Sequence, residues 1–149
     1  MSPENLIIRP FEATDTTALS EIWFAASRIA HPFIGASRLT EQKLLIEEHY
    51  LPRAETWVAL MHGQPVGFIS LLDTFVGGLF VSPEQQGLGI GRRLATHALT
   101  LKGELTLEVY TENAQAMRFY RRLGFREISR RPFDDDGFPY ENVRMHRTV

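Results

Sequence analysis

The stretch EQQGLGIGRRL, Glu84 to Leu94, places glycines at 87, 89 and 91 and follows them with two arginines. It lies between an apolar run that ends at Val81 and a segment with helical spacing. A strand, a glycine loop and a helix in this order direct unpaired backbone N–H groups at an anion. Glycines let the anion approach because they carry no Cβ. The stretch predicts an anion site, and a tight turn with solvated arginines is the alternative.

The same stretch excludes two well-known nucleotide-binding loops. The dinucleotide fingerprint G-x-G-x-x-G fails because the sixth position from Gly87 is Arg92. The phosphate loop G-x-x-x-x-G-K-[ST] fails because the sequence contains no Gly-Lys pair. The anion is therefore expected in a different kind of loop.

The composition is that of an ordinary globular protein. The chain has 149 residues, of which 44% are hydrophobic and 23% charged, and we expect a single domain over residues 1–149. The net charge of −2 gives no general reason to expect nucleic-acid binding. No apolar run reaches the roughly 18 residues of a membrane span, and the first residues do not resemble a signal peptide. We expect a cytoplasmic protein with neither a nucleic-acid nor a membrane partner.

The absence of cysteine excludes disulfides, thiolate metal sites and a cysteine nucleophile. The histidines are scattered and form no metal-ligand spacing, so we expect no metal. The short acidic run Asp134 to Asp136 sits beside Gly137 and predicts a solvated turn.

Hydrophobic spacing predicts a mixed α/β domain in the order β-α-α-β-β-β-α-β-α-β-β. Strands are expected at residues 6–9, 56–61, 65–72, 75–81, 105–110, 125–131 and 142–148. Helices are expected from residue 14 to the His31-Pro32 pair and at 40–50, 89–100 and 114–123. The residues expected on buried helix faces are Ala18, Leu19, Ile22, Trp23, Ala26, Ile29, Leu44, Leu45, Leu94, Ala95, Ala98 and Leu101, with Tyr50 as a further candidate. The pair Gly77-Gly78 predicts a bulge or bend in its strand, with a flexible turn as the alternative.

Two motifs connect the glycine loop to a family. The run Gln86-Gly87-Leu88-Gly89-Ile90-Gly91 matches the signature Q/R-x-x-G-x-G/A of the GNAT superfamily of N-acetyltransferases. The second signature, N-x-x-A-x-x-F-Y-x-x-x-G-F, is matched by Asn113, Ala116, Phe119, Tyr120, Gly124 and Phe125. From residue 55 onward the chain closely resembles small single-domain bacterial members, which include acetyltransferases of protein lysines and of ribosomal-protein N-termini. The resemblance implies a mostly antiparallel sheet flanked by helices, with a splayed cofactor cleft.

The resemblance also implies that acetyl-CoA is the co-substrate. The glycine loop would cradle its pyrophosphate, and the preceding strand would bind its pantetheine arm through the backbone. Asn113 would contact the cofactor, although its position also fits a simple helix cap. The cofactor-binding residues implied are Leu79, Phe80, Val81, Gln86, Gly87, Leu88, Gly89, Ile90, Gly91, Arg92, Asn113 and Tyr120.

Amine acetylation needs a neutral amine, a stabilised oxyanion and a protonated leaving thiolate. Tyr120 matches the family tyrosine that protonates the thiolate, whereas its helical spacing alone favours a core aromatic. Glu108 resembles the glutamate that serves as base in some bacterial members. The alternatives for Glu108 are a solvent-facing residue, an arginine-bridged residue, or a site in which ordered water removes the proton. The backbone N–H of Val81 is the implied oxyanion donor.

The resemblance places the acceptor between the first helices and the last hairpin. Trp23, His31, Phe33 and Glu108 are the candidate acceptor-binding residues, together with Tyr50 and the loop 134–140. Each also has a plain structural interpretation as a core, connector or turn residue. The expected function is transfer of an acetyl group from acetyl-CoA to a primary amine by direct attack in a ternary complex. The amine belongs to a protein lysine, a protein N-terminus or a small molecule. A non-catalytic acetyl-CoA sensor or partner module is the alternative, and the sequence fits either a monomer or a homodimer.

Overall fold

The computed structural model describes residues 5–149, and the elements follow the predicted order. The strands are β1 (Leu6–Pro10), β2 (Glu55–Met61), β3 (Gln64–Leu72), β4 (Phe75–Val81), β5 (Glu104–Tyr110), β6 (Arg126–Arg131) and β7 (Asn142–Thr148). The helices are α1 (Thr16–Ala30), α2 (Ala36–Leu45), α3 (Ile90–Lys102) and α4 (Ala114–Arg122). Short helical turns accompany them at η1 (Ala13–Asp15), η2 (Pro32–Ile34), η3 (Ile46–Tyr50) and η4 (Pro83–Gln85), and η3 is a π-helical turn.

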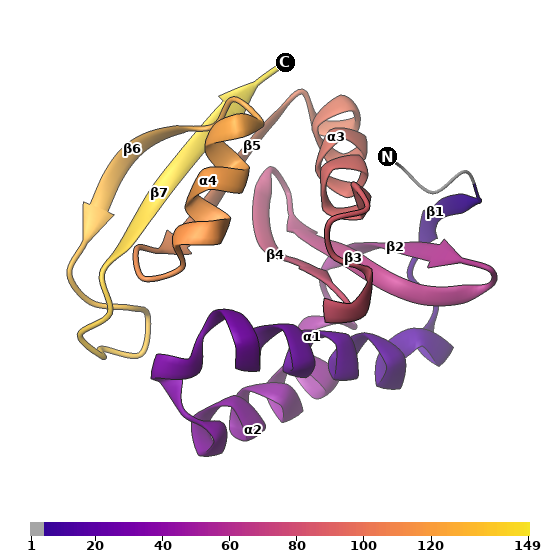
Figure 1. Cartoon of the computed structure of the whole chain (residues 1–149), viewed down its shortest axis with the longest axis horizontal. Helices are drawn as coiled ribbons and strands as arrows, with labels where there is room; N and C mark the ends of the chain where they lie inside the picture. Colours follow the sequence, from indigo (N-terminus) through magenta and orange to yellow (C-terminus); the bar gives the residue numbers. More distant parts are fainter. Residues whose placement is uncertain (1–4) are drawn as a thin grey trace.

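The strands form one seven-stranded sheet in the order β1-β2-β3-β4-β5-β7-β6. All neighbouring pairs are antiparallel except β4 and β5, which are parallel. Figure 1 shows α1 and α2 on one side of the sheet and α3 and α4 on the other. This is the predicted mixed α/β fold with a mostly antiparallel sheet.

The two faces of the sheet have separate hydrophobic cores. On the α1 and α2 face, Leu19, Trp23 and Leu39 pack with Val58 of β2 and Phe68 of β3. The other core joins α3 and α4 to the alternate residues of the same strands and to β5 and β7. Its fully buried members include Ala59, Ile69, Leu94, Ala98, Leu105, Val143 and Met145. Alternation of side chains along the strands supplies both cores from one sheet.

The buried helix faces are shorter than predicted. Ile29 and Leu101 are 64% and 49% exposed, because the buried face of each helix ends earlier, at Ser27 and Leu99. Leu44 and Leu45 are also exposed, at 54% and 56%, which contradicts their predicted inward orientation.

The predicted helix at 40–50 combines two elements with different periods. The α-helix begins earlier, at Ala36, directly after Gly35 with its φ of +90°. It ends at Leu45 and continues as the π-helical turn Ile46–Tyr50. A π-turn is wider than an α-turn and shifts the phase of the side chains that follow. Within α2 itself, Leu39 is the buried residue.

The predicted bulge is confirmed. In the β3–β4 pair, Ser70 lies opposite Gly78 and Leu71 lies opposite Val76, so Gly77 is the extra residue. Within residues 5–149, no helix is long and apolar enough to cross a membrane.

Candidate active site

The glycine loop links β4 to α3, and its glycines have two distinct physical roles. Gly87 and Gly89 adopt φ values of +85° and +82°, a region that favours residues without a Cβ. At Gly91 the reason is packing, because a Cβ there would lie 3.3 Å from Phe119 Cζ and 3.6 Å from Val81 Cγ2. Gly91 therefore lets α3 start close to both β4 and α4.

The start of α3 has the properties of an anion site. Gly89 occupies the N-cap position and has no side chain to satisfy the first N–H groups of the helix. Those N–H groups lie at the positive end of the helix dipole, and the exposed Arg92 lies in the first turn. A glycine loop of this shape, with free N–H donors and a guanidinium, fits a pyrophosphate group.

A cleft opens where β4 and β5 separate. The parallel strands pair only as far as Val76 and Leu107, and the bulge at Gly77 follows at once. Cavities of about 580 Å³ and 260 Å³ occupy the cleft. Both are lined by Gly77 and Gly78 on one wall and by residues 108–110 on the other. The two cavities therefore adjoin at the bulge.

Tyr120 projects from α4 into the smaller cavity. Its ring has edge contacts with Phe119 and Phe125 at centroid distances of 5.1 Å and 5.5 Å, and it packs on the core. Burial raises the pKa of the Tyr120 hydroxyl. The proton therefore stays on the oxygen at neutral pH, as a proton donor requires.

Two polar groups beside Tyr120 link α4 to α1. The Asn113 side chain caps α4 by accepting a hydrogen bond of 3.1 Å from Ala116 N, and its Nδ2 lies 3.4 Å from His31 Nε2. Burial lowers the pKa of His31 to about 4, so its ring is neutral at physiological pH. Ser27 of α1 is 1% exposed, and its hydroxyl has no hydrogen-bond partner among the described residues. All three residues line the smaller cavity.

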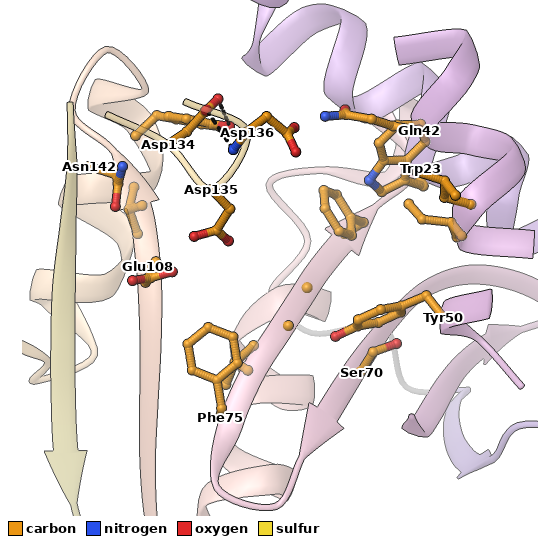
Figure 2. Close-up of a pocket in the computed structure, with 18 of the residues that line it drawn as sticks. Trp23, Gln42, Tyr50, Ser70, Phe75, Glu108, Asp134, Asp135, Asp136 and Asn142 are labelled. Carbon is orange, nitrogen blue, oxygen red and sulfur yellow. Dashed lines mark hydrogen bonds between the residues drawn. The ribbon is translucent and has the colours of Figure 1, made fainter. Parts of the chain in front are cut away.

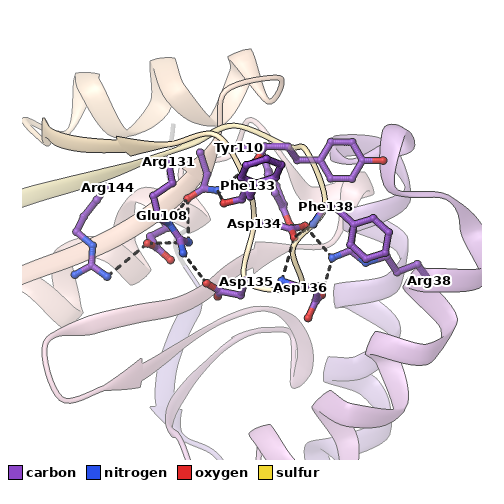
Figure 3. A network of polar contacts seen from close by, with 12 residues as sticks. Arg38, Glu108, Tyr110, Arg131, Phe133, Asp134, Asp135, Asp136, Phe138 and Arg144 are labelled. Carbon is purple, nitrogen blue, oxygen red and sulfur yellow. Dashed lines mark hydrogen bonds and ion pairs between the residues drawn. The ribbon is translucent and has the colours of Figure 1, made fainter.

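Glu108 lines both cavities from the middle of β5, and its carboxylate is bound by two arginines (Figure 3). Glu108 Oε2 lies 3.2 Å from Arg131 Nη2 and 3.5 Å from Arg144 Nη2. The glutamate side chain is 20% exposed. Glu108 is therefore bridged to arginines, and its role as a base stays a prediction.

The acidic run is a solvated turn only in part: Asp135 and Asp136 are exposed, as predicted, whereas Asp134 is buried. Its carboxylate Oδ2 accepts a hydrogen bond of 2.8 Å from Arg38 Nη2, and Arg38 also donates to Asp136 at 2.6 Å. The guanidinium of Arg38 lies 4.0 Å from the centre of the Phe138 ring. Tyr110 donates a further hydrogen bond of 3.2 Å to Asp134. These contacts, drawn in Figure 3, fasten the β6–β7 loop to α2 across the end of the cleft.

The aromatic residues expected at the acceptor side have different positions. Trp23 is 6% exposed and belongs to the core, although its edge lines both cavities. Phe33 lines neither cavity and instead packs against His31, Tyr110 and Tyr140. The Tyr140 hydroxyl donates a hydrogen bond of 2.9 Å to the Phe33 carbonyl. Phe33 therefore supports the wall of the cleft from behind.

The structure brings together part of the predicted site. Neither cavity is lined by the glycine loop 86–91, by Arg92 or by Val81. The predicted residues that line one or both cavities are Trp23, His31, Tyr50, Leu79, Phe80, Glu108, Asn113 and Tyr120. In the part of the chain that the structure describes, no group of three His, Cys, Asp or Glu residues is placed to hold a metal ion.

Sequence reasoning missed two polar residues that line the cleft, Ser27 and Arg131, and Arg38, which holds Asp134 at its end. Ser27 follows Trp23 by four positions and so shares its helix face, which is the signal that could have indicated it. Arg38 and Arg131 gave no such signal, because their partners Asp134 and Glu108 lie far away in the sequence.

Comparison with known proteins agrees with this geometry. Residues 52–127 match the sequence profile of the acetyltransferase (GNAT) domain. The peptidyl-lysine N-acetyltransferase YjaB of Escherichia coli is 40% identical over 128 residues, which cover 85% of this chain and 86% of YjaB. The peptidyl-lysine N-acetyltransferase YiaC of Escherichia coli is 32% identical, over 80% of this chain and 82% of YiaC. The solution structure of apo-form YjaB superposes with a TM-score of 0.86 at 36% identity, covering 95% of this chain and 96% of that chain.

Proposed function

The chain belongs to the GNAT family and is an acetyl-CoA-dependent N-acetyltransferase, and from this premise we propose that it acetylates protein lysines by direct transfer. The observation that carries the proposal is the pair of adjoining cavities at the β4 bulge. One cavity holds a tyrosine suited to protonate a leaving group, and the other is open to an amine. A donor and an acceptor bound in these cavities would meet at Gly77 and Gly78.

On the donor side, the backbone supplies most of the proposed contacts. The N–H groups at the start of α3 would bind the pyrophosphate of acetyl-CoA, with Gln86, Leu88 and Arg92 beside it. Beyond Val76, β4 has no ladder partner on its β5 side. Residues 79–81 can therefore offer backbone N–H and C=O groups to the pantetheine arm, as a sheet edge does to an added strand. We propose the Val81 N–H as the donor to the carbonyl oxygen that gains charge.

Acetyl-CoA supplies an activated thioester, and the residues of the cleft manage the protons. We propose that Tyr120 donates its hydroxyl proton to the departing thiolate sulfur. Burial raises the pKa of this hydroxyl, so the proton is on the oxygen before the thiolate forms. We propose that the Glu108 carboxylate receives the amine proton, directly or through water. Its contacts with Arg131 and Arg144 hold the carboxylate at the passage between the cavities.

The larger cavity supports a lysine acceptor. Its walls include Trp23 and Phe75, which suit the aliphatic stem of a lysine. Asp135 and Asp136 lie at its other side, as Figure 2 shows, and carry the charge that attracts an ammonium group. The two relatives described above are both named for peptidyl-lysine, which favours lysine over a protein N-terminus or a small amine.

The test is acceptor-dependent release of coenzyme A from acetyl-CoA. Three acceptor classes separate the possibilities: lysine peptides with a blocked N-terminus, peptides whose only amine is the N-terminus, and polyamines. We expect release with the first class and an acetyl group on the lysine by mass spectrometry. Tight acetyl-CoA binding without release in any class would refute the proposed transfer and leave a sensor.

A further inference from the structure

The guanidinium of Arg131, at the end of β6, is bound by three side chains. Its Nε and Nη2 donate hydrogen bonds of 3.2 Å and 3.1 Å to Asn142 Oδ1. Its Nη2 also lies 3.2 Å from Glu108 Oε2, and its Nη1 lies 3.0 Å from Asp135 Oδ1 (Figure 3). The N–H groups of an arginine form a rigid, planar fork. The position of this fork therefore determines where it meets Glu108.

Asn142, the first residue of β7, fixes the position of the fork. Asn142 is 4% exposed and lies opposite Arg131 in the β6–β7 register. Its Nδ2 donates hydrogen bonds of 3.1 Å to the Phe133 carbonyl and 3.2 Å to the Tyr140 carbonyl. An arginine can only donate hydrogen bonds and a carbonyl can only accept them, so one orientation of the amide alone satisfies all of these partners. Asn142 therefore connects the Arg131 guanidinium to both ends of the β6–β7 loop.

The second arginine at Glu108 has no comparable anchor. Arg144 lies opposite Glu108 in the β5–β7 register, and its Nη2 is 3.5 Å from the same Oε2. Among residues 5–149 its guanidinium forms no other ion pair, and it lies 5.6 Å from the centre of the Phe75 ring. A long side chain held by one polar contact keeps much of its rotamer freedom. Of the two arginines, Arg131 is the one that the fold fixes in place.

An anchored guanidinium restricts the Glu108 carboxylate. A glutamate has several rotatable side-chain bonds, and Glu108 lines two cavities into which its carboxylate can turn. A base acts when it lies about 2.6–3.2 Å from the atom that gives up the proton, or one water away. Misplacement by about 1 Å can cost about 100-fold in rate. A fixed cation beside Oε2 selects one position of the carboxylate.

We propose that Arg131 is a positioning residue for the base: anchored by Asn142, it holds the Glu108 carboxylate at the passage between the cavities, so that the β6–β7 loop fixes where the base lies. The inference rests on the proposed function, in which Glu108 receives the amine proton. Arg131 itself transfers no proton and acts on the reaction only through the carboxylate.

The test is a cycle of Arg131→Gln, Glu108→Gln and the double variant, assayed with a lysine peptide. We expect Arg131→Gln to lower kcat about tenfold, a part of the about 100-fold that the loss of a base costs. In the Glu108→Gln background, Arg131→Gln should change kcat by less than about twofold, because the carboxylate on which it acts is gone. The KM for acetyl-CoA should stay within about twofold, because Arg131 does not line the smaller, donor cavity. Equal losses of kcat in both backgrounds would show a general structural role and overturn the inference.

Two variants separate position from charge. Arg131→Lys keeps the charge but lacks the planar fork that reaches Asn142 and Glu108 together, so its kcat should stay below that of wild type. Arg144→Gln removes the unanchored arginine and should lower kcat less than Arg131→Gln does. A wild-type kcat in Arg131→Lys, or equal losses in Arg131→Gln and Arg144→Gln, would overturn the inference because the anchor would then have no role.

The neighbouring Arg130 provides a matched control on the same strand. It forms its ion pairs with Glu127 and Glu141, and its removal costs an exposed ion pair of about 0–1 kcal/mol. Arg130→Gln should therefore keep the kcat of wild type. If Arg130→Gln and Arg131→Gln lower kcat and Tm equally, the loss belongs to the strand as a whole and the inference is wrong.

The pH–rate profile separates this inference from the proposed function. A carboxylate that loses a neighbouring cation takes up a proton at higher pH, so the kcat deficit of Arg131→Gln should grow as the pH falls. The ammonium of the lysine peptide titrates equally for every variant, so differences between the profiles report the enzyme. If Glu108→Gln has the kcat and profile of wild type, the base of the proposed function fails and the inference fails with it. If Glu108→Gln is impaired and Arg131→Gln is not, the inference alone fails.

Discussion

The ion pair between Arg38 and Asp134 predicts that the β6–β7 loop contributes strongly to stability. The Asp134 side chain is 5% exposed and that of Arg38 is 14% exposed. The Asp134 carboxylate also accepts hydrogen bonds of 3.0 Å from the backbone N–H groups of Asp136 and Phe138. Asp134→Ala removes all of these bonds and leaves the guanidinium of Arg38 without its buried partner. Breaking a buried pair in this way costs about 3–5 kcal/mol.

The neighbouring Asp135 offers a matched control. Its side chain is 80% exposed and, among residues 5–149, forms an ion pair only with Arg131, at 3.0 Å. Exposed ion pairs contribute about 0–1 kcal/mol, so Asp135→Ala should have little effect on unfolding. At about 2–4 °C per kcal/mol for a chain of this size, Asp134→Ala should lower the Tm by roughly 6–20 °C. The measurement is the free energy of unfolding from urea titration at pH 7, compared between wild type, Asp134→Ala and Asp135→Ala.

The pH dependence of unfolding checks the electrostatic origin of this effect. Burial alone would raise the pKa of Asp134, but the hydrogen bonds from Arg38 and from the Phe138 N–H outweigh it and lower the pKa. A carboxyl group with a lowered pKa in the folded state stabilises above its unfolded pKa of about 3.9 and loses that contribution as the pH falls through the folded value. The difference between wild type and Asp134→Ala should therefore shrink only in strong acid. If Asp134→Ala and Asp135→Ala lower the free energy of unfolding equally at pH 7, the buried ion pair does not make the strong contribution proposed for it.

Three further predictions concern the cleft. Tyr120→Phe should lower kcat about 100-fold or more and change the Kd for acetyl-CoA little, measured by steady-state kinetics and calorimetry; an unchanged kcat would remove Tyr120 as the acid. Glu108→Gln should depress the rate most at low pH, where the amine most needs to lose a proton, and a pH–rate profile identical to wild type would favour water as the route. Because burial lowers the pKa of His31 to about 4, the folded state should lose stability as the pH falls from about 6.5 toward 4. His31→Asn should flatten that part of the unfolding curve, and an unaltered slope would contradict the burial argument.

The fold could be predicted from the sequence because its signals are local. Alternation and helical spacing predicted the element order, and Gly77-Gly78 predicted the bulge that opens the cleft. The second signature assigned both Asn113 and Tyr120 to the cofactor site, and both line the smaller cavity. Each of these predictions depends on residues that are close in the chain.

What could not be predicted depends on pairs of distant residues. Nothing near Asp134 indicates that Arg38 of α2 lies against it, so the acidic run had the pattern of a solvated turn. The π-helical turn likewise has no sequence period of its own, and Leu44 and Leu45, which directly precede it, are exposed and not in the predicted core. At Asp134, Leu44 and Leu45, contacts between distant parts of the chain determine burial, and the local sequence pattern does not.

The separation of β4 from β5 affects which side chains of the cleft can be substituted during evolution. The sheet contains an internal edge, and unpaired strand edges ordinarily invite aggregation with other chains. Here that edge lies inside a cleft, flanked by α1 and by the fastened β6–β7 loop. Any ligand bound there in extended form is recognised by the main chain, which is the same whatever side chains Leu79 and Phe80 carry. Related enzymes can therefore exchange these side chains during evolution and retain the common donor, while the facing wall diverges to accept new partners.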